Sequence, residues 1–208
     1  MPTPIGHALG GALVALAFGA GLAGRSGGAG QNDPDLRSLY LPRLPYLPAC
    51  AISACLPDID FFWGRHNMET HSLGFAALVG LAVFAWRRNG RLALACTLAV
   101  CTHVLFDWLG SDDFPPLGVM ALWPLTTQFY FANAFVFDAI SRRYWLPGFV
   151  QHNVIAVLRE IAILAPITAA LYWWRLKNSH GDAETRRRRL FKNKRQFETL
   201  GDIRRRRM

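Results

Sequence analysis

The amino-acid sequence predicts an all-α, polytopic membrane helix bundle, with about five transmembrane helices and additional re-entrant or interfacial helices. Three observations lead to this prediction. Of the 208 residues, 52% are hydrophobic and only 18% are charged, whereas about 25% of the residues of a soluble domain are charged. The apolar residues form long blocks instead of being spread evenly. The positive charges gather in one loop and at the C-terminal end.

A transmembrane helix needs about 20 successive apolar residues, and this length locates the predicted crossings. They are residues 5–24, 41–57, 70–86, 92–109 and 154–174. The second is the poorest, because it contains Arg43 and several prolines. Residues 117–149 are apolar but interrupted by Pro124 and three charged side chains, so we expect one or two re-entrant or interface-lying helices there.

The distribution of Lys and Arg predicts how the chain is oriented. With five crossings, 19 of the 23 Lys and Arg fall on the face that holds the C-terminal tail, and three fall on the opposite face. We therefore expect a bacterial plasma (inner) membrane protein with its N-terminus outside. A membrane-embedded domain, 1–175, would be followed by a basic cytoplasmic tail, 176–208. Such a tail is attracted to anionic lipid of the bilayer, and no basic-aromatic pattern indicates a nucleic-acid partner.

The His and acidic residues next to the predicted crossings gather toward the outer ends of the helices. Charge counting did not use them, so this agreement is independent. Ionisable side chains at such positions mark functional cavities. They are His7, Asp58, Asp60, His66, His71, His103, Asp107, His152 and Glu160.

Some of these residues also have simpler interpretations. His7 and His152 can be solvated at the interface. Asp58 follows Pro57, so the pair can simply end one helix and cap the next, and Thr70 can be the N-cap of the third crossing.

His103 and Asp107 resist a simple interpretation. Their i, i+4 spacing places both side chains on one helix face, and His103 lies about 17 Å along the helix from its start. Two such side chains are a natural pair of metal ligands. Asp58 and Asp60 would also repel one another beside a membrane unless a cation held them. We therefore predict a polar cavity with one or two divalent ions, Zn²⁺ first, with Mn²⁺ or Fe²⁺ as alternatives.

Five blocks of the sequence occur in a distinctive order. They are "MPTPIGHALGGAL" (1–13), "LPDID" (56–60), "THSL" (70–73), "HVLFD" (103–107) and "GVMALWPLT" (118–126). Together they resemble the YdjM-like family of bacterial inner-membrane proteins, which are described as membrane-bound metal-dependent hydrolases. That family is similar to zinc-dependent phospholipase C and P1 nuclease, helical enzymes whose metal cluster includes a His-x-x-x-Asp pair.

The resemblance implies a set of site residues. His103 and Asp107 match the paired ligands, and the earlier ligands match His7, Asp58 or Asp60, and His71. Glu160 is a further candidate ligand, although Arg159 beside it offers an ion pair instead. The candidate catalytic residues are Asp58, Asp60, Arg65 and His66. The chain departs from the family where Asn67 replaces a frequent Arg, whose role Arg65 could take.

These observations lead to a hypothesis of a metal-dependent hydrolase that cleaves a phosphoester bond of a lipid-like substrate at the extracytoplasmic face. Two alternatives belong to other classes. A metal-ion or proton transporter would need a polar path across the membrane, but residues 78–86 and 91–100 contain neither acid nor His. A non-catalytic membrane protein could use the same ligands as a structural metal site.

Overall fold

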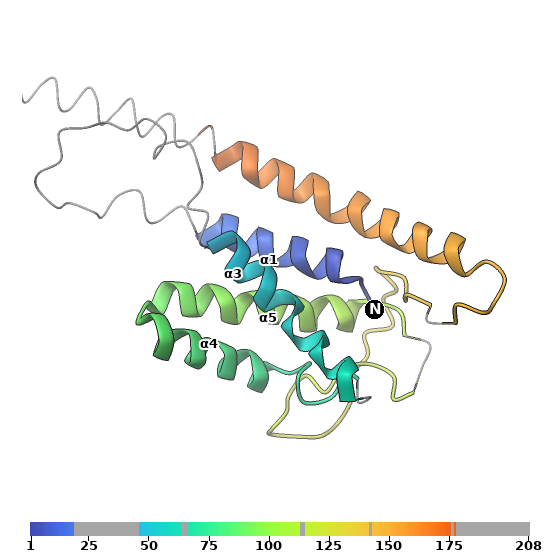
Figure 1. The fold of residues 1–208 in the computed structure, drawn as a ribbon, viewed down its shortest axis with the longest axis horizontal. Coiled ribbons are helices and arrows are strands. Elements are labelled where there is room, and N and C mark those ends of the chain that lie inside the picture. Colours follow the sequence, from blue (N-terminus) through green and yellow to red (C-terminus); the bar gives the residue numbers. More distant parts are fainter. Residues whose placement is uncertain (19–45, 64–65, 113–114, 142, 176, 178–208) are drawn as a thin grey trace, which may run out of the picture. The chain divides into compact units, whose positions relative to one another are not determined.

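The structure, a computed structural model, describes residues 1–18, 46–63, 66–112, 115–141, 143–175 and 177 (Figure 1). Its helices are α1 (Pro4–Phe18), α3 (Tyr46–Cys55), the 3₁₀ helix η2 (Leu56–Trp63), α4 (Leu73–Arg87), α5 (Gly90–Leu109) and a last helix, Phe149–Arg175. Within these described residues, β-structure is limited to isolated bridges, which confirms the all-α prediction. The described residues from Met1 to Leu171 belong to one compact unit, and a second unit contains the last helical turn, from Tyr172.

Side-chain caps set where α4 and α5 begin. The Ser72 hydroxyl accepts a hydrogen bond from the backbone N–H of Phe75, and the Asn89 side chain accepts from Arg91 and Leu92. These caps satisfy N–H groups that a helix leaves without partners in its first turn. Ser72, and not Thr70, is therefore the N-cap of α4, which frees Thr70 for another contact.

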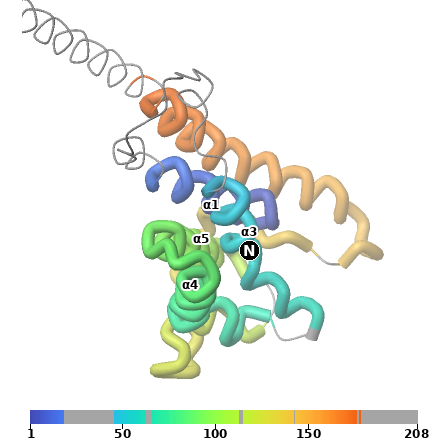
Figure 2. The backbone as a smooth tube through the Cα atoms, turned by 60° about the vertical axis from the view of Figure 1, so that its left-hand side comes forward, coloured from blue at the N-terminus to red at the C-terminus, as the bar shows by residue number. Residues whose placement is uncertain are grey.

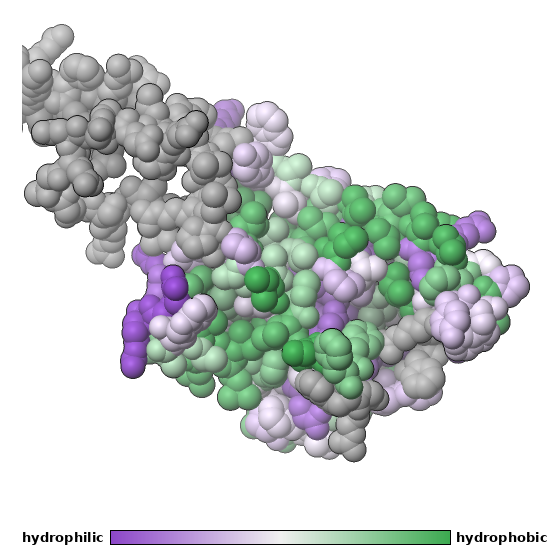
Figure 3. Space-filling model, in the orientation of Figure 1, coloured by the Kyte–Doolittle hydropathy of each residue, from purple (hydrophilic) through white to green (hydrophobic). Residues whose placement is uncertain are grey.

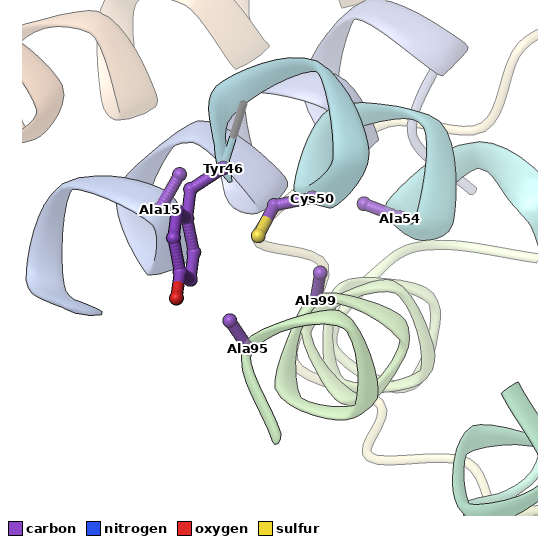
Figure 4. Packing of buried hydrophobic residues seen from close by; sticks show 6 residues of the cluster. All are labelled: Ala15, Tyr46, Cys50, Ala54, Ala95 and Ala99. Atoms are coloured by element: carbon purple, nitrogen blue, oxygen red, sulfur yellow. The ribbon is translucent and has the colours of Figure 1, made fainter. Parts of the chain in front are cut away.

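Helix α5 packs against α1, α3 and α4 (Figures 1 and 2). Small side chains and one aromatic ring, that of Tyr46, line its contact with α1 and α3, as Figure 4 shows together with Ala15, Cys50, Ala54, Ala95 and Ala99. The contact between α1 and α3 is so close that a Cβ atom on Gly11 would lie 2.4 Å from the carbonyl oxygen of Cys50. Small residues at such positions are typical of membrane helices, whose backbones pack closely.

Two helices in the described part of the chain are long and apolar enough to cross a membrane. They are α5, with 20 residues, and Phe149–Arg175, with 27 residues, of whose apolar window only 17% is buried. Helices α1 and α4 have 15 residues each and α3 has 10. The predicted five crossings thus stay a prediction, as do the orientation and the tail, of which only residue 177 is described. In Figure 3 hydrophobic residues cover the helices, and hydrophilic residues gather at the α4–α5 turn.

Residues 110–148 differ from the prediction. We expected one or two re-entrant or interfacial helices within 117–149, but the described residues there form turns and two bridges, Gly110 to Phe137 and Val119 to Tyr130, until the last helix begins. The segment's backbone bonds to the helix ends instead. The N–H groups of Leu73 and Gly74 donate to the carbonyl oxygens of residues 121 and 123. Prolines remove backbone donors, so these tertiary bonds replace a helical ladder.

Candidate metal centre

Polar side chains from α1, η2, the segment before α4, and α5 meet in one cluster. Four of them are no more than 1% exposed and the fifth, on η2, is 17% exposed. We call the five residues the His–Asp cluster. They are His7, Asp58, His71, His103 and Asp107. All five are candidate ligands in the sequence, and the structure brings them together from positions 100 residues apart.

Asp107 faces three imidazole rings. Its Oδ1 atom lies 3.5 Å from Nε2 of His7, and its Oδ2 atom lies 3.0 Å from Nε2 of His103 and 3.5 Å from Nε2 of His71. Asp58 completes the cluster, since its Oδ1 atom lies 3.8 Å from Nε2 of both His71 and His103. The ring of His7 also stacks on that of His103, with a centroid distance of 3.6 Å. Nitrogen and oxygen atoms therefore converge from several sides on one small volume.

The ring of His103 is held in a defined orientation. Its Nδ1 atom lies 2.7 Å from the backbone carbonyl oxygen of Ala54. A carbonyl oxygen only accepts hydrogen bonds, so Nδ1 carries the proton and a neutral ring presents its Nε2 lone pair to the cluster. A partner of this kind on the far nitrogen is typical of histidines that bind metals.

Asp60 lies outside the His–Asp cluster and orients two histidines, His71 and His66. Its Oδ2 atom is 3.1 Å from Nδ1 of His71, and its Oδ1 atom is 2.8 Å from Nδ1 of His66. The hydroxyl of Thr70 also donates to Oδ2, at 2.9 Å. Because Nδ1–H of His71 donates a hydrogen bond to Asp60, the Nε2 atom of that ring faces Asp58 and Asp107. The two acids of "LPDID" thus have different positions, which the sequence left open.

Several buried atoms of the cluster have no hydrogen-bond partner. They are both ring nitrogens of His7, Nε2 of His71, Nε2 of His103 and both carboxylate oxygens of Asp107. A buried polar atom without a partner costs about 1–3 kcal/mol, so a group of them needs an explanation. A cation would satisfy most of these atoms, namely one nitrogen of each imidazole and the Asp107 carboxylate. Three imidazoles and two carboxylates suit Zn²⁺, Mn²⁺ or Fe²⁺, so the residues fit the predicted divalent metal.

The electrostatics outside the predicted crossings also favour a cation. Burial alone would raise the pKa of Asp60, but hydrogen bonds from His66 and His71 outweigh it and hold this pKa well below its ordinary value. The pKa of Asp58 is likewise lowered, because the nearby imidazoles of His71, His103 and His7 outweigh the effect of burial. The carboxylates are therefore ionised, and positive charge is stabilised among them.

Other predicted site residues lie elsewhere. Glu160 is not part of the cluster, since its carboxylate accepts hydrogen bonds from the backbone and hydroxyl of Thr3. Arg159 bonds to Asp138 at 2.6 Å instead of to Glu160. His152 is exposed on the last helix, with Nε2 2.7 Å from the carbonyl oxygen of residue 139.

Two catalytic candidates remain, His66 and Arg65, and the structure describes only the first. His66 is 14% exposed, stacks on Phe61 at 4.1 Å between ring centroids and bonds to Asp60, so it lies at the edge of the cluster. Arg65 lies outside the described residues. The sequence analysis missed two contributors, the Thr70 hydroxyl and the Ala54 carbonyl. The "TH" pair places the Thr70 hydroxyl next to a candidate ligand, so the sequence could have indicated it. A contact with a backbone carbonyl cannot be predicted from residue types, because every residue has one.

Comparisons with known proteins agree with the resemblance seen in the sequence. No curated protein and no solved structure matches the chain, so the similarity to phospholipase C and P1 nuclease stays a prediction. A family model described as "YdjM inner membrane protein" matches residues 1–179, which contain all of the His–Asp cluster. The chain therefore belongs to the YdjM inner membrane protein family.

Proposed function

We propose that this protein is a metal-dependent hydrolase of the bacterial inner membrane, which cleaves a phosphoester bond of a lipid-like substrate at the extracytoplasmic face. The observation that carries the proposal is the convergence of buried, unpartnered nitrogen and oxygen atoms from His7, His71, His103 and Asp107. Such a group of donor atoms costs stability unless it binds a cation. Asp58, more exposed than the others, is the ligand nearest the substrate side.

The residues of the chain divide into those that hold the metal and those that orient them. His7, Asp58, His71, His103 and Asp107 would hold one or two divalent ions, Zn²⁺ first, and a bound ion supplies the Lewis acidity that activates water for hydrolysis. Asp60 keeps His71 in the tautomer that presents Nε2, and the Ala54 carbonyl does the same for His103. His66, at the edge of the cluster, is the candidate for moving a proton to or from the substrate, and Arg65 is the candidate for stabilising negative charge.

A lipid-like substrate is supported by the surroundings of Asp58. The same 3₁₀ helix exposes Phe61 and Phe62, which are 47% and 87% exposed. Exposed apolar rings of this kind favour burial in the lipid boundary of a membrane. A phosphoester at headgroup depth would then lie next to the ligand on the exposed side of the cluster. The choice of a phosphoester itself rests on the family resemblance.

The test combines metal content with hydrolysis. The full chain, its His103→Ala variant and its His152→Ala variant are purified in detergent, and their bound metals are measured by mass spectrometry. His152 is the matched control, because it is a histidine outside the cluster. Each protein is then mixed with phosphatidylethanolamine–phosphatidylglycerol vesicles, and release of phosphorylated headgroup is followed with and without a chelator.

We expect wild type and His152→Ala to carry metal and release headgroup, and His103→Ala to do neither. Wild-type protein with as little metal as His103→Ala would refute the proposal. Metal-loaded wild type without hydrolysis of any phosphoester lipid would favour the alternative of a structural metal site. Metal transport into vesicles by the His103-dependent site would favour the transporter.

A further inference from the structure

We infer that Glu160 is a positioning residue for the metal centre: from the last helix, its buried carboxylate holds the N-terminus of α1 and thereby sets the place of His7. The consequence for metal binding rests on the proposed function. The anchoring of α1 itself does not, and it can be measured without a metal.

Glu160 is buried in a helix that is otherwise mostly exposed. Its side chain is 0% exposed, whereas Leu158 and Ile161 beside it are 58% and 38% exposed. Both of its oxygens are engaged by one residue, Thr3. Oε1 accepts from the backbone N–H of Thr3 at 2.7 Å, and Oε2 accepts from the Thr3 hydroxyl. An acidic residue in a membrane helix needs partners, and these two bonds join segments 157 residues apart in the sequence.

Thr3 is the N-cap of α1. Its hydroxyl oxygen accepts a bond from the backbone N–H of Gly6 at 3.3 Å, and its carbonyl oxygen accepts from the N–H of His7 at 3.1 Å. Pro4 takes the first helical position, where its fixed φ favours a helix and its missing N–H is no loss. The Thr3 hydroxyl thus donates to Glu160 while it accepts from the helix. The negative charge of the Glu160 carboxylate also lies at the positive end of the α1 dipole, which further stabilises the contact between Glu160 and α1.

The contact leaves little freedom for α1 to shift. A Cβ atom on Gly6 would lie 2.8 Å from Oε2 of Glu160, so the backbone rests directly against the carboxylate. His7 follows immediately, and its own N–H bonds to Thr3. Its ring stacks on His103, and its Nε2 atom faces Asp107. A displacement of Thr3 would therefore move the His7 ring relative to the other ligands.

The experiment first tests the anchor in metal-free protein. Hydrogen exchange of a peptide covering residues 1–10 is compared in wild type, Glu160→Gln and Arg159→Gln. The amide of Gln keeps the size of Glu and one acceptor but loses the charge, and Arg159→Gln removes the neighbouring ion pair without touching Thr3. We expect exchange at the start of α1 to rise on the order of tenfold in Glu160→Gln, because a bond to a charged group is lost. Equal exchange in wild type and Glu160→Gln would overturn the inference.

The second measurement tests the consequence for His7. Zn²⁺ affinity is measured by competition with a chromophoric chelator, and Co²⁺ is used for its visible spectrum. We expect Glu160→Gln to lower Zn²⁺ affinity roughly tenfold and to shift the Co²⁺ spectrum toward that of His7→Ala, since positioning partners typically contribute about 10–100-fold. Thr3→Val should change Zn²⁺ affinity and the Co²⁺ spectrum in the same way, whereas Thr3→Ser should keep both at wild-type values. The loss of Zn²⁺ affinity in the double variant Glu160→Gln with Thr3→Val should be smaller than the sum of the two single losses in free energy.

Two outcomes separate this inference from the proposed function. A Glu160→Gln protein that unfolds more easily but keeps wild-type Zn²⁺ affinity and Co²⁺ spectrum would reduce Glu160 to a structural residue and overturn the inference. Wild type that binds no Zn²⁺ would refute the proposed function, and the exchange comparison would then decide the anchor alone. If Glu160→Gln does not fold, Thr3→Val answers the same question.

Discussion

Both halves of α5 have one buried face, but the two faces bury different kinds of side chain. In the first half, Ala95, Cys96 and Ala99 pack against small and apolar residues of the neighbouring helices. In the second half, His103 and Asp107 are equally buried but face other polar side chains. Three of their side-chain polar atoms lack a hydrogen-bond partner.

This difference indicates that the first half stabilises the fold and that the polar residues of the second half serve a function. Close packing of apolar side chains stabilises a folded protein, and the first half contributes in this way. Unpartnered polar atoms reduce stability, and they persist where a function requires them. Substitutions in the packed half should therefore change stability, and substitutions in the His–Asp cluster should change metal binding. The following predictions test that division.

The largest effect is expected from Asp107→Asn. This substitution keeps the size of the side chain but removes the charge that faces three imidazoles, so Zn²⁺ affinity should fall by more than the about 100-fold seen for orienting partners. The metal-free protein should unfold at an unchanged or higher temperature. Chelator competition and thermal unfolding in detergent measure the two quantities. Asp138→Asn, which breaks the ion pair with Arg159, is the control that should keep metal binding.

Gly11→Val tests the packed side of the comparison. The new side chain would strike the backbone of α3, since a Cβ atom there lies 2.4 Å from a carbonyl oxygen. We expect the free energy of unfolding to fall by about 1–3 kcal/mol. The metal bound per folded molecule should be unchanged. Gly90→Ala is the matched control, because a Cβ atom on Gly90 meets nothing within 4 Å. Equal effects of the two substitutions would contradict close packing at Gly11.

Asp58→Asn and Asp60→Asn together test which acid binds the metal. Asp60 orients His71 and His66, so Asp60→Asn should lower Zn²⁺ affinity by about 10–100-fold. Asp58 faces the cluster directly, so Asp58→Asn should lower it further. Isothermal titration of both variants in the same detergent decides the order. The assignment is wrong if Asp60→Asn proves the more damaging of the two.

The smallest effect is expected from Thr70→Val, which removes one hydroxyl behind Asp60. The loss of a single hydrogen bond corresponds to about 0.5–1.5 kcal/mol, so Zn²⁺ affinity should fall by less than about tenfold. Thr70→Ser keeps the hydroxyl and should behave as wild type. A Thr70→Val protein that loses its metal entirely would mean that the hydroxyl contacts the ion directly.

Much of the site could be predicted because the relevant chemistry is local in the sequence. The i, i+4 spacing of His103 and Asp107 places both on one face of α5, whatever packs against it. Apolar blocks around His7, Asp58 and His71 made ionisable residues conspicuous, because such residues are costly near a membrane without a function. The all-α class and the family followed from the same blocks.

Only the tertiary structure decided the rest, because it depends on which groups meet across the fold. Asp58 and Asp60 are two residues apart on the same 3₁₀ helix, and their roles separate only once His71 and His66 lie beside Asp60. Glu160 moved from candidate ligand to the partner of Thr3 because α1 begins next to the last helix. The described residues of 117–148 lack the expected helices since the backbone of this segment bonds to the ends of α4 and α5. By itself, the sequence determined which ionisable residues are candidates for the site, and the packing of distant segments determined what each one contacts.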